Sequence, residues 1–244
     1  MNFLKNHPFA VEAFFESSIV LTFAVTKEQV EKLIPAPLVL DTFKDKWAFI
    51  AVAMVRTKNL RPKGFPKCMG NSFFLIGYRI FVRYTNTAGK RLRGLYILKS
   101  ETNKRKMTFL GNLFTHYNYS TTDIFQKTFG SDKIIRSNKS NIELIIEQSQ
   151  GEIKIPEGSP FSDWKEARRF AGPLPHTFTC KKENGTVLII EGVRQNWKPE
   201  PINVKSYFFD FIHSMNLNNA VLANAFEINS IPYSWKKGKI EKWK

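Results

Sequence analysis

The strongest constraint on the fold of this chain is a succession of apolar runs rich in aromatic and β-branched residues, separated by turn-forming residues. The clearest case is the run 73–84, which passes through Asn86-Thr87-Ala88-Gly89 into a second run at 92–98. Residues of these types favour strands, and a turn of this kind between two such runs predicts a β-hairpin. Because aromatic residues make up 14% of the chain, we expect a mostly β protein.

Further elements follow from the same patterns. A hairpin is predicted from 38–43 and 47–55 around Lys44-Asp45-Lys46, and another from 176–182 and 186–195, where Asn184-Gly185 suits a type I′ turn. Strands are predicted at 18–25, 141–147 and 152–155, with a turn near Gly151. Helices are predicted after Thr26, near Lys104 with Thr102 or Asn103 as the cap, and over 162–170.

No repeat, linker or composition break divides the sequence, so we expect one domain over residues 1–244, mostly antiparallel β with a few short helices. No apolar stretch approaches the roughly 20 residues of a membrane-spanning helix, and no signal peptide is expected because Glu12 and Glu16 interrupt the first apolar segment. Cys68 and Cys180 are too few for a disulfide framework. A cytoplasmic protein without membrane insertion is expected.

The formal net charge of +16 raises the possibility of nucleic-acid or anionic-surface binding. Basic residues that could follow phosphates are Arg56, Lys58, Arg61, Lys63, Lys67, Lys90, Arg91 and Arg93. The basic residues are spread over the whole length and form no known binding motif, so a solvated surface is favoured. A non-catalytic basic binding protein remains the alternative hypothesis.

The sequence predicts no metal and no cofactor. The four histidines, His7, His116, His176 and His213, are far apart and have no ligand-type residue at metal-binding spacing. No glycine-rich phosphate loop follows a strand, and no Gly-x-Ser-x-Gly motif occurs.

The densest group of charged residues is 99–106, where a strand gives way to a helix. Lys104, Arg105 and Lys106 repel one another, which favours a neutral amine only if a lysine is enclosed. At about 6 Å and an effective dielectric of about 20, a neighbouring charge costs about 2.8 kcal/mol, against about 0.7 kcal/mol in water. A solvated basic turn is the alternative interpretation, and burial decides between the two.

The order of these pieces resembles the acetoacetate decarboxylase-like superfamily. Leu33-Ile34-Pro35-Ala36-Pro37-Leu38 followed by Leu40-Asp41 and the strand 47–55 is similar to the opening element of that superfamily. The residues Arg61-Pro62-x-Gly64, Arg79-x-Phe81-Val82, Gly94-Leu95-Tyr96 and Trp197-x-Pro199 resemble its uncharacterised bacterial YqjF-like branch.

This resemblance implies a single cone-shaped, largely antiparallel β-barrel with an internal cavity. In the decarboxylases a cavity lysine forms a Schiff base with a β-keto acid, and a second lysine lowers its pKa. Their motif is a glutamate, four residues and Pro-Lys-Lys. Here Glu101 matches the glutamate, the proline is absent, and a shift of two residues places Arg105 and Lys106 at the lysine pair.

Taken with this resemblance, the sequence leads us to expect a barrel that binds a small anionic organic acid. Lyase chemistry and a homo-oligomer are both left open. The candidate catalytic residues are Lys104, Lys106 and Glu101, and the candidate substrate-binding residues are Arg79 and Arg105. Arg79 is chosen because a strand arginine amid apolar residues is costly to bury without a partner. A surface ion pair of Arg79 is the alternative.

Overall fold

The computed structural model describes residues 3–147, 152–172, 174–195 and 197–243. Strands occupy most of the described chain and short helices connect them, which confirms the prediction of a mostly β protein. The strands are β1 (Val11–Thr26), β2 (Val39–Leu40), β3 (Trp47–Pro62), β4 (Asn71–Thr85), β5 (Arg91–Thr102), β6 (Tyr119–Thr121), β7 (Phe125–Phe129), β8 (Asp132–Ser137), β9 (Ile142–Glu147), β10 (His176–Lys181), β11 (Thr186–Arg194), β12 (Glu200–Pro201), β13 (Asn203–Phe209), β14 (Val221–Trp235) and β15 (Lys239–Lys242). The helices are α1 (Lys27–Val30), α2 (Arg105–Phe114), α3 (Trp164–Ala171) and α4 (Asp210–His213), with 3₁₀ turns at Leu4–Asn6, Glu31–Leu33, Lys67–Met69 and Lys182–Asn184.

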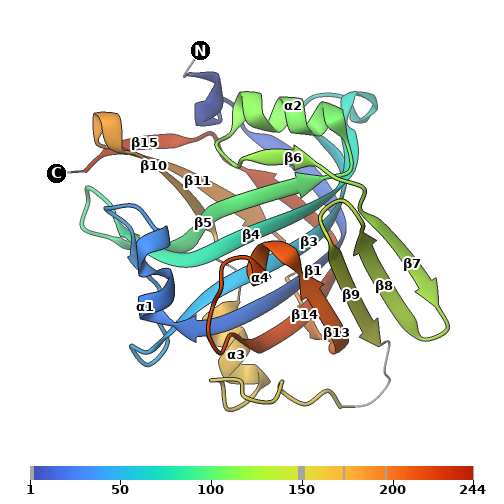
Figure 1. The fold of residues 1–244 in the computed structure, drawn as a ribbon. Coiled ribbons are helices and arrows are strands. Elements are labelled where there is room, and N and C mark those ends of the chain that lie inside the picture. The colour runs from blue at the N-terminus through green and yellow to red at the C-terminus, as the bar shows by residue number, and fades with distance from the viewer. Residues whose placement is uncertain (1–2, 148–151, 173, 196, 244) are drawn as a thin grey trace.

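The larger sheet curls until two of its strands meet. Its order is β12-β14-β1-β3-β4-β5-β10-β11-β15, and β11 also pairs with β14, which closes the central strands into a ring. Most neighbours are antiparallel, while β10 and β6 run parallel to β5. Figure 1 shows α2 across one end of this curled sheet and α3 at the opposite end. Successive residues of each strand therefore face alternately into the ring and away from it.

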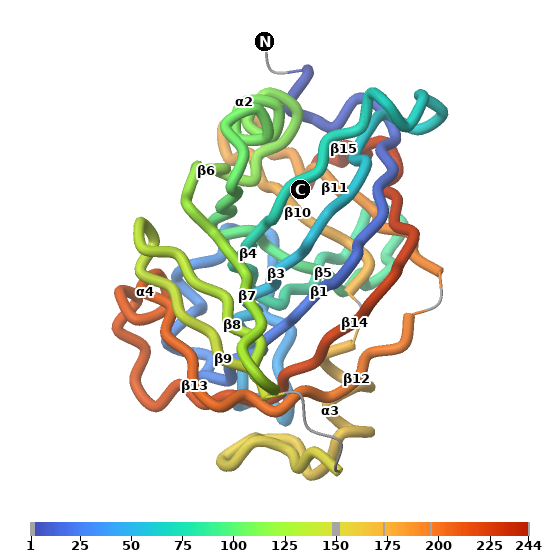
Figure 2. The backbone as a smooth tube through the Cα atoms, turned by 90° about the vertical axis from the view of Figure 1, so that its right-hand side faces the viewer, coloured from blue at the N-terminus to red at the C-terminus, as the bar shows by residue number. Residues whose placement is uncertain are grey.

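The outward face of the ring carries the largest apolar core. Val52 and Met54 of β3 and Ile76 and Tyr78 of β4 are buried there against a second sheet, ordered β13-β9-β8-β7. Figure 2 shows this second sheet beside the curled one. Because these outward side chains form the apolar core, the fold does not depend on inward side chains of the same strands filling the interior of the ring.

Several sequence predictions are confirmed. The hairpin of β4 and β5 closes through Gly89, at φ 76°. Helix α3 forms, and the side chain of Asp163 caps it by accepting a hydrogen bond from the Glu166 amide at 2.7 Å.

Among the described residues, no helix is long and apolar enough to cross a membrane. The prediction of one domain over residues 1–244 stays a prediction.

The predicted hairpin of 38–43 with 47–55 is wrong in its pairing. Strand β2 pairs with β4, and the turn beyond it makes only an isolated bridge between Phe43 and Trp47. The reason is Asp41, which follows β2 and binds arginines of β4 and β5.

The predicted strand at 152–155 is not formed, and Gly151 lies outside the described residues. Strand β13, from much later in the chain, pairs with β9 instead, with Asn203 opposite Glu147. The edge that a strand at 152–155 would have extended is therefore occupied.

Two local predictions need correction. Lys104 stands at the N-cap of α2 in place of Thr102 or Asn103, because the Asn103 side chain accepts a hydrogen bond from the Phe74 amide at 2.9 Å. The hairpin of β10 and β11 forms, but its turn is a 3₁₀ turn ending in Gly185 at φ 58°, longer than a two-residue type I′ turn.

Asp41 fixes the packing of three elements. Its side chain is fully buried, and its two carboxylate oxygens lie 2.5 Å from Nε of Arg83 on β4 and Nε of Arg93 on β5. Arg93 also donates a hydrogen bond to the Phe170 carbonyl of α3 at 2.7 Å. One carboxylate therefore holds two strands and, through Arg93, a helix.

Asp41→Asn should destabilise the fold by about 3–5 kcal/mol, because it leaves two partly buried guanidinium groups without a counter-charge. Urea unfolding monitored by tryptophan fluorescence measures this change. The control is Asp45→Asn, whose exposed carboxylate pairs with Lys27 and should change stability by less than about 0.5 kcal/mol. Equal effects of the two substitutions would contradict the assignment.

Candidate functional site

The ring encloses a cavity of about 400 Å³. Inward-facing residues of β1, β3, β4 and β5 form much of its wall, and Met107, Leu110 and Phe114 of α2 contribute one side. Small-molecule sites in proteins have volumes of about 300–1,000 Å³ and mostly apolar walls with a few polar groups. The polar groups of this wall therefore define what the cavity can hold.

Arg79 is a partly buried charged residue of the wall. It lies on the inward face of β4, and burial lowers the pKa of its guanidinium, while the phenols of Tyr233, Tyr117 and Tyr119 act in the opposite direction. Among the described residues its Nε has no hydrogen-bond partner, and no carboxylate forms an ion pair with it. The surface ion pair that is the alternative for Arg79 is thus not observed in the described part of the chain.

Gly77 makes room for this guanidinium. It precedes Arg79 on the same face of β4, and a Cβ at Gly77 would come within 2.9 Å of Arg79 Nε and 3.3 Å of Cζ. The guanidinium therefore folds back along the strand into space that any other residue would fill.

Further hydrogen-bond donors of the wall lack partners within the described residues. These are the Tyr117 hydroxyl and Nε1 of Trp197. Thr177 approaches the Tyr117 phenol without reaching hydrogen-bond geometry. Burial raises the pKa of Tyr117, and raises the pKa of Tyr119 to about 12, so both phenols keep their protons at neutral pH. The wall therefore offers donors that a ligand or water can satisfy.

The seam between β11 and β14 places a second guanidinium beside a phenol. Arg194 and Tyr233 are directly opposite one another in this pairing, and both line the cavity. Gly192 permits the arrangement, because a Cβ there would collide with the Tyr233 hydroxyl. Arg194 lies over the Trp197 ring, 4.5 Å from its centroid. Burial raises the pKa of Tyr233 and lowers the pKa of Arg194.

The charge of the wall is positive. Its described residues include Arg61, Arg79 and Arg194 but no lysine, aspartate or glutamate. Arg61 is neutralised by Glu12, with Nη2 2.6 Å from the carboxylate, and also donates to two backbone carbonyls. Arg79 and Arg194 are left as the uncompensated charges among the described residues.

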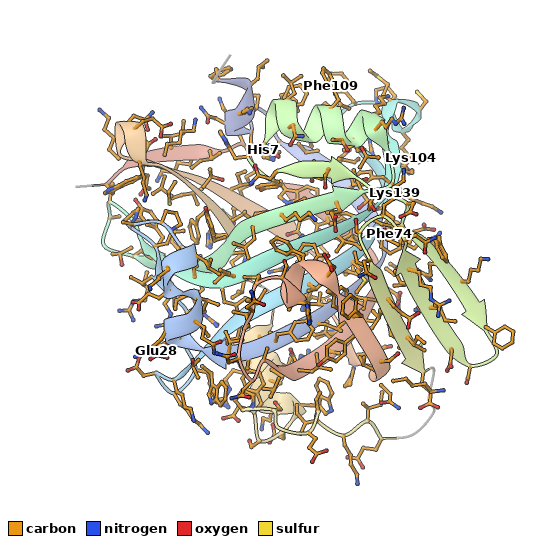
Figure 3. All side chains as sticks on the ribbon, in the orientation of Figure 1. His7, Glu28, Phe74, Lys104, Phe109 and Lys139 are labelled. Atoms are coloured by element: carbon orange, nitrogen blue, oxygen red, sulfur yellow. The ribbon has the colours of Figure 1, made fainter. Side chains whose placement is uncertain are left out.

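His7 supplies a neutral imidazole. It lies near α2, where its amide donates to the Phe114 carbonyl at 3.3 Å, and it lines the cavity (Figure 3). Burial lowers the pKa of His7 to about 4, so it is uncharged at neutral pH. The imidazole can therefore accept or donate a hydrogen bond without adding charge.

Comparison with family models decides the family. Residues 13–228 match the model of DUF2071, described as an uncharacterized conserved protein (COG2071). The chain belongs to the DUF2071 family. A comparison with curated proteins finds no match.

Solved structures show the fold that this DUF2071 chain shares. Acetoacetate decarboxylase from Legionella pneumophila subsp. pneumophila str. Philadelphia 1 is similar with a TM-score of 0.64 and 8% identity, over 96% of this chain and 88% of that chain. The enduracididine biosynthesis enzyme MppR complexed with pyruvate gives a TM-score of 0.55 and 8% identity, over 96% and 90%. The resemblance to the acetoacetate decarboxylase-like superfamily is confirmed for the fold.

The predicted lysines of the DUF2071 chain do not line the cavity. Lys104, Arg105 and Lys106 are exposed at the start of α2, and Figure 3 shows Lys104 at the edge of the molecule. In α2, Met107 and Leu110 face the cavity instead. The enclosure that amine activation requires is therefore not provided at these positions.

Glu101 is buried but is engaged elsewhere. Its carboxylate lies 2.8 Å from Nζ of Lys99 and accepts hydrogen bonds from Ser140 at 2.7 Å and Tyr78 at 3.2 Å. It does not belong to the described cavity wall. The structure thus separates Arg79 from Glu101, Lys104, Arg105 and Lys106.

The sequence reasoning missed most polar residues of the wall: Tyr117, Tyr119, Arg194, Trp197 and Tyr233. Arg194 and Tyr233 lie on strands that become neighbours only when the sheet closes. The available signal was Gly192, a glycine inside a strand pattern, which indicates close approach of another group.

Several basic residues considered for nucleic-acid binding are paired. Arg56 and Lys58 both contact Glu16, and Arg93 binds Asp41. Part of the positive charge is thereby neutralised locally. Nucleic-acid binding stays an untested alternative.

Incubation with acetoacetate and borohydride should leave Lys104 and Lys106 unmodified, because exposed ammonium groups do not become amine nucleophiles near neutral pH. Peptide mass spectrometry of the treated protein is the measurement. A reduced imine on either lysine would contradict this expectation and would restore both as catalytic candidates.

Gly77→Ala should displace the Arg79 guanidinium while leaving the fold intact, because the added methyl group meets the mobile end of a side chain rather than backbone. A crystal structure of the variant shows the position of Arg79, and thermal unfolding reports on the fold. An unchanged Arg79 in the variant would show that Gly77 is not what makes its position possible.

Proposed function

We propose that this chain binds a small organic acid in the cavity, with its anionic group on Arg79. The observation that carries the proposal is the enclosed guanidinium without a carboxylate partner among the described residues. Burying such a charge is costly unless it is paired and hydrogen-bonded. A bound carboxylate supplies the missing counter-charge and the missing acceptors together.

The rest of the wall supports this ligand class. The unpartnered groups near Arg79 and Trp197 are donors, and a carboxylate accepts from donors only. The apolar residues around them, such as Phe73, Phe81 and Leu95, suit a hydrocarbon body. The fold neighbour MppR is described as complexed with pyruvate, which is also a small organic acid.

Decarboxylation through a lysine imine is not part of the proposal. The described wall contains no lysine, and the predicted lysines are exposed on α2. The neutral His7 and the protonated phenols of Tyr117, Tyr119 and Tyr233 offer a ligand uncharged hydrogen-bonding groups.

Arg79→Met should weaken carboxylate binding by about 10- to 100-fold, because it removes hydrogen bonds to a charged group worth about 1.5–3 kcal/mol. The same substitution should raise the melting temperature of the free protein, because it removes an uncompensated buried charge. Isothermal titration calorimetry with pyruvate, phenylpyruvate and phenylacetate, each against its amide, measures binding, and scanning calorimetry measures stability.

Arg83→Met is the matched control. Arg83 lies on the same strand but binds Asp41 and is not part of the described wall. Its loss should lower stability by about 1–3 kcal/mol, because Asp41 loses one partner, and should leave acid binding unchanged. Acids that bind Arg79→Met as tightly as the wild type would contradict the proposal.

A further inference from the structure

The positive charge of the cavity is twofold. Arg79 on β4 and Arg194 on β11 both line it, and neither pairs with a carboxylate in the described part of the chain. The residues outside the description, at 1–2, 148–151, 173, 196 and 244, include no aspartate or glutamate. A ligand with a single negative charge would therefore compensate only one of these two unpaired positive charges.

Each guanidinium lies near an unpartnered donor of the wall, and both lie near the Tyr233 phenol. Arg79 lies close enough to Tyr117 and Tyr119 for its charge to oppose the rise in the pKa of each phenol. Arg194 lies over Trp197, whose indole N–H has no partner among the described residues. The wall thus has two donor clusters, Arg79 with Tyr117 and Arg194 with Trp197.

The two clusters belong to one space. The charges of both Arg194 and Arg79 act on the Tyr233 phenol and lower its pKa against the effect of burial. Tyr233 is opposite Arg194 in the β11–β14 pairing. Aromatic side chains line the same cavity, among them Phe15, Phe226 and Trp235. One molecule with a hydrocarbon spacer can therefore reach both clusters.

We infer that the ligand of this cavity is an organic dicarboxylate, with one carboxylate on Arg79 and Tyr117 and the other on Arg194 and Trp197. This inference rests on the proposed function and specifies its ligand. Two carboxylates match the charge of the two uncompensated guanidinium groups. Each carboxylate accepts hydrogen bonds from the donors of one cluster. The apolar wall accommodates the hydrocarbon spacer.

Calorimetric titration with straight-chain α,ω-dicarboxylates of about four to ten carbons tests the dicarboxylate assignment. Only chains that span the two clusters gain the second contact. Each diacid is compared with the monocarboxylate of equal carbon number. We expect one or two adjacent chain lengths to bind at least about tenfold more tightly than their monoacids, the factor that one additional charge-assisted contact supplies.

Arg194→Gln and Trp197→Phe should each reduce or abolish this preference, because each removes a partner of the second carboxylate. The preference is measured in each variant as the ratio of diacid affinity to monoacid affinity. Trp197→Phe removes only the N–H donor and keeps an aromatic ring under Arg194, so it provides a test if Arg194→Gln does not fold. Arg91→Gln removes one exposed positive charge outside the wall, and it should leave the preference intact.

The outcomes separate the two proposals. Monoacid binding that depends on Arg79, with no gain for any diacid or no effect of Arg194 and Trp197, overturns the dicarboxylate assignment and retains the proposed function. Acid binding that does not depend on Arg79, or no binding of any acid, overturns both.

Discussion

The pairing of β11 with β14 is the contact on which the cavity depends. It joins Gly192 to Trp235, Val193 to Ser234 and Arg194 to Tyr233, and without it the curled sheet would be open along one side. Aromatic packing holds the β14 side of this seam against β1, because Tyr233 stacks on Phe15 of β1 with ring centroids 4.7 Å apart and contacts Trp235 of its own strand at 4.6 Å. Such pairs contribute about 0.5–1.5 kcal/mol beyond the area they bury. The residues that close the ring are thus also residues that line it, so closure and the polar character of the cavity arise together.

Two arginines on β4 show how differently the same side chain can be accommodated. Arg83 is neutralised within the chain by Asp41, and that ion pair ties β4 to β2, β5 and α3. Arg79, four residues earlier on the same face, has the space left by Gly77 but no carboxylate partner among the described residues. The first arrangement organises the fold. The second arrangement costs stability, and the proposed ligand would offset that cost.

The sequence predicted what local patterns determine. Apolar runs separated by turn residues predicted the β4–β5 hairpin, and apolar residues recurring every three or four positions predicted α2. The apolar neighbours of Arg79 in the sequence made it a candidate. Long-range choices were not predictable in this way. Strand β2 pairs with β4 because Asp41, which follows β2, binds arginines of β4 and β5. Strand β13 pairs with the edge of β9 at which a strand at 152–155 was expected. Arg194, Tyr233 and Tyr117 come from three distant segments, so their meeting depends on closure of the ring, which no local pattern encodes.

The fold shared with acetoacetate decarboxylase provides the enclosed space, and the side chains in it decide the chemistry. The same Coulomb estimate applies to the lysines of α2 and to the arginines of the wall. At about 6 Å, a unit charge is worth about 0.7 kcal/mol in water and about 2.8 kcal/mol at an effective dielectric of about 20. Lys104 and Lys106 are exposed and belong to the first case, as do most residues behind the net charge of +16. That excess attracts anions over long distances without selecting among them. Under the proposed function, selection among anions would fall to Arg79 and Arg194, because charges removed from bulk water respond more strongly to the number and spacing of a ligand's carboxylates.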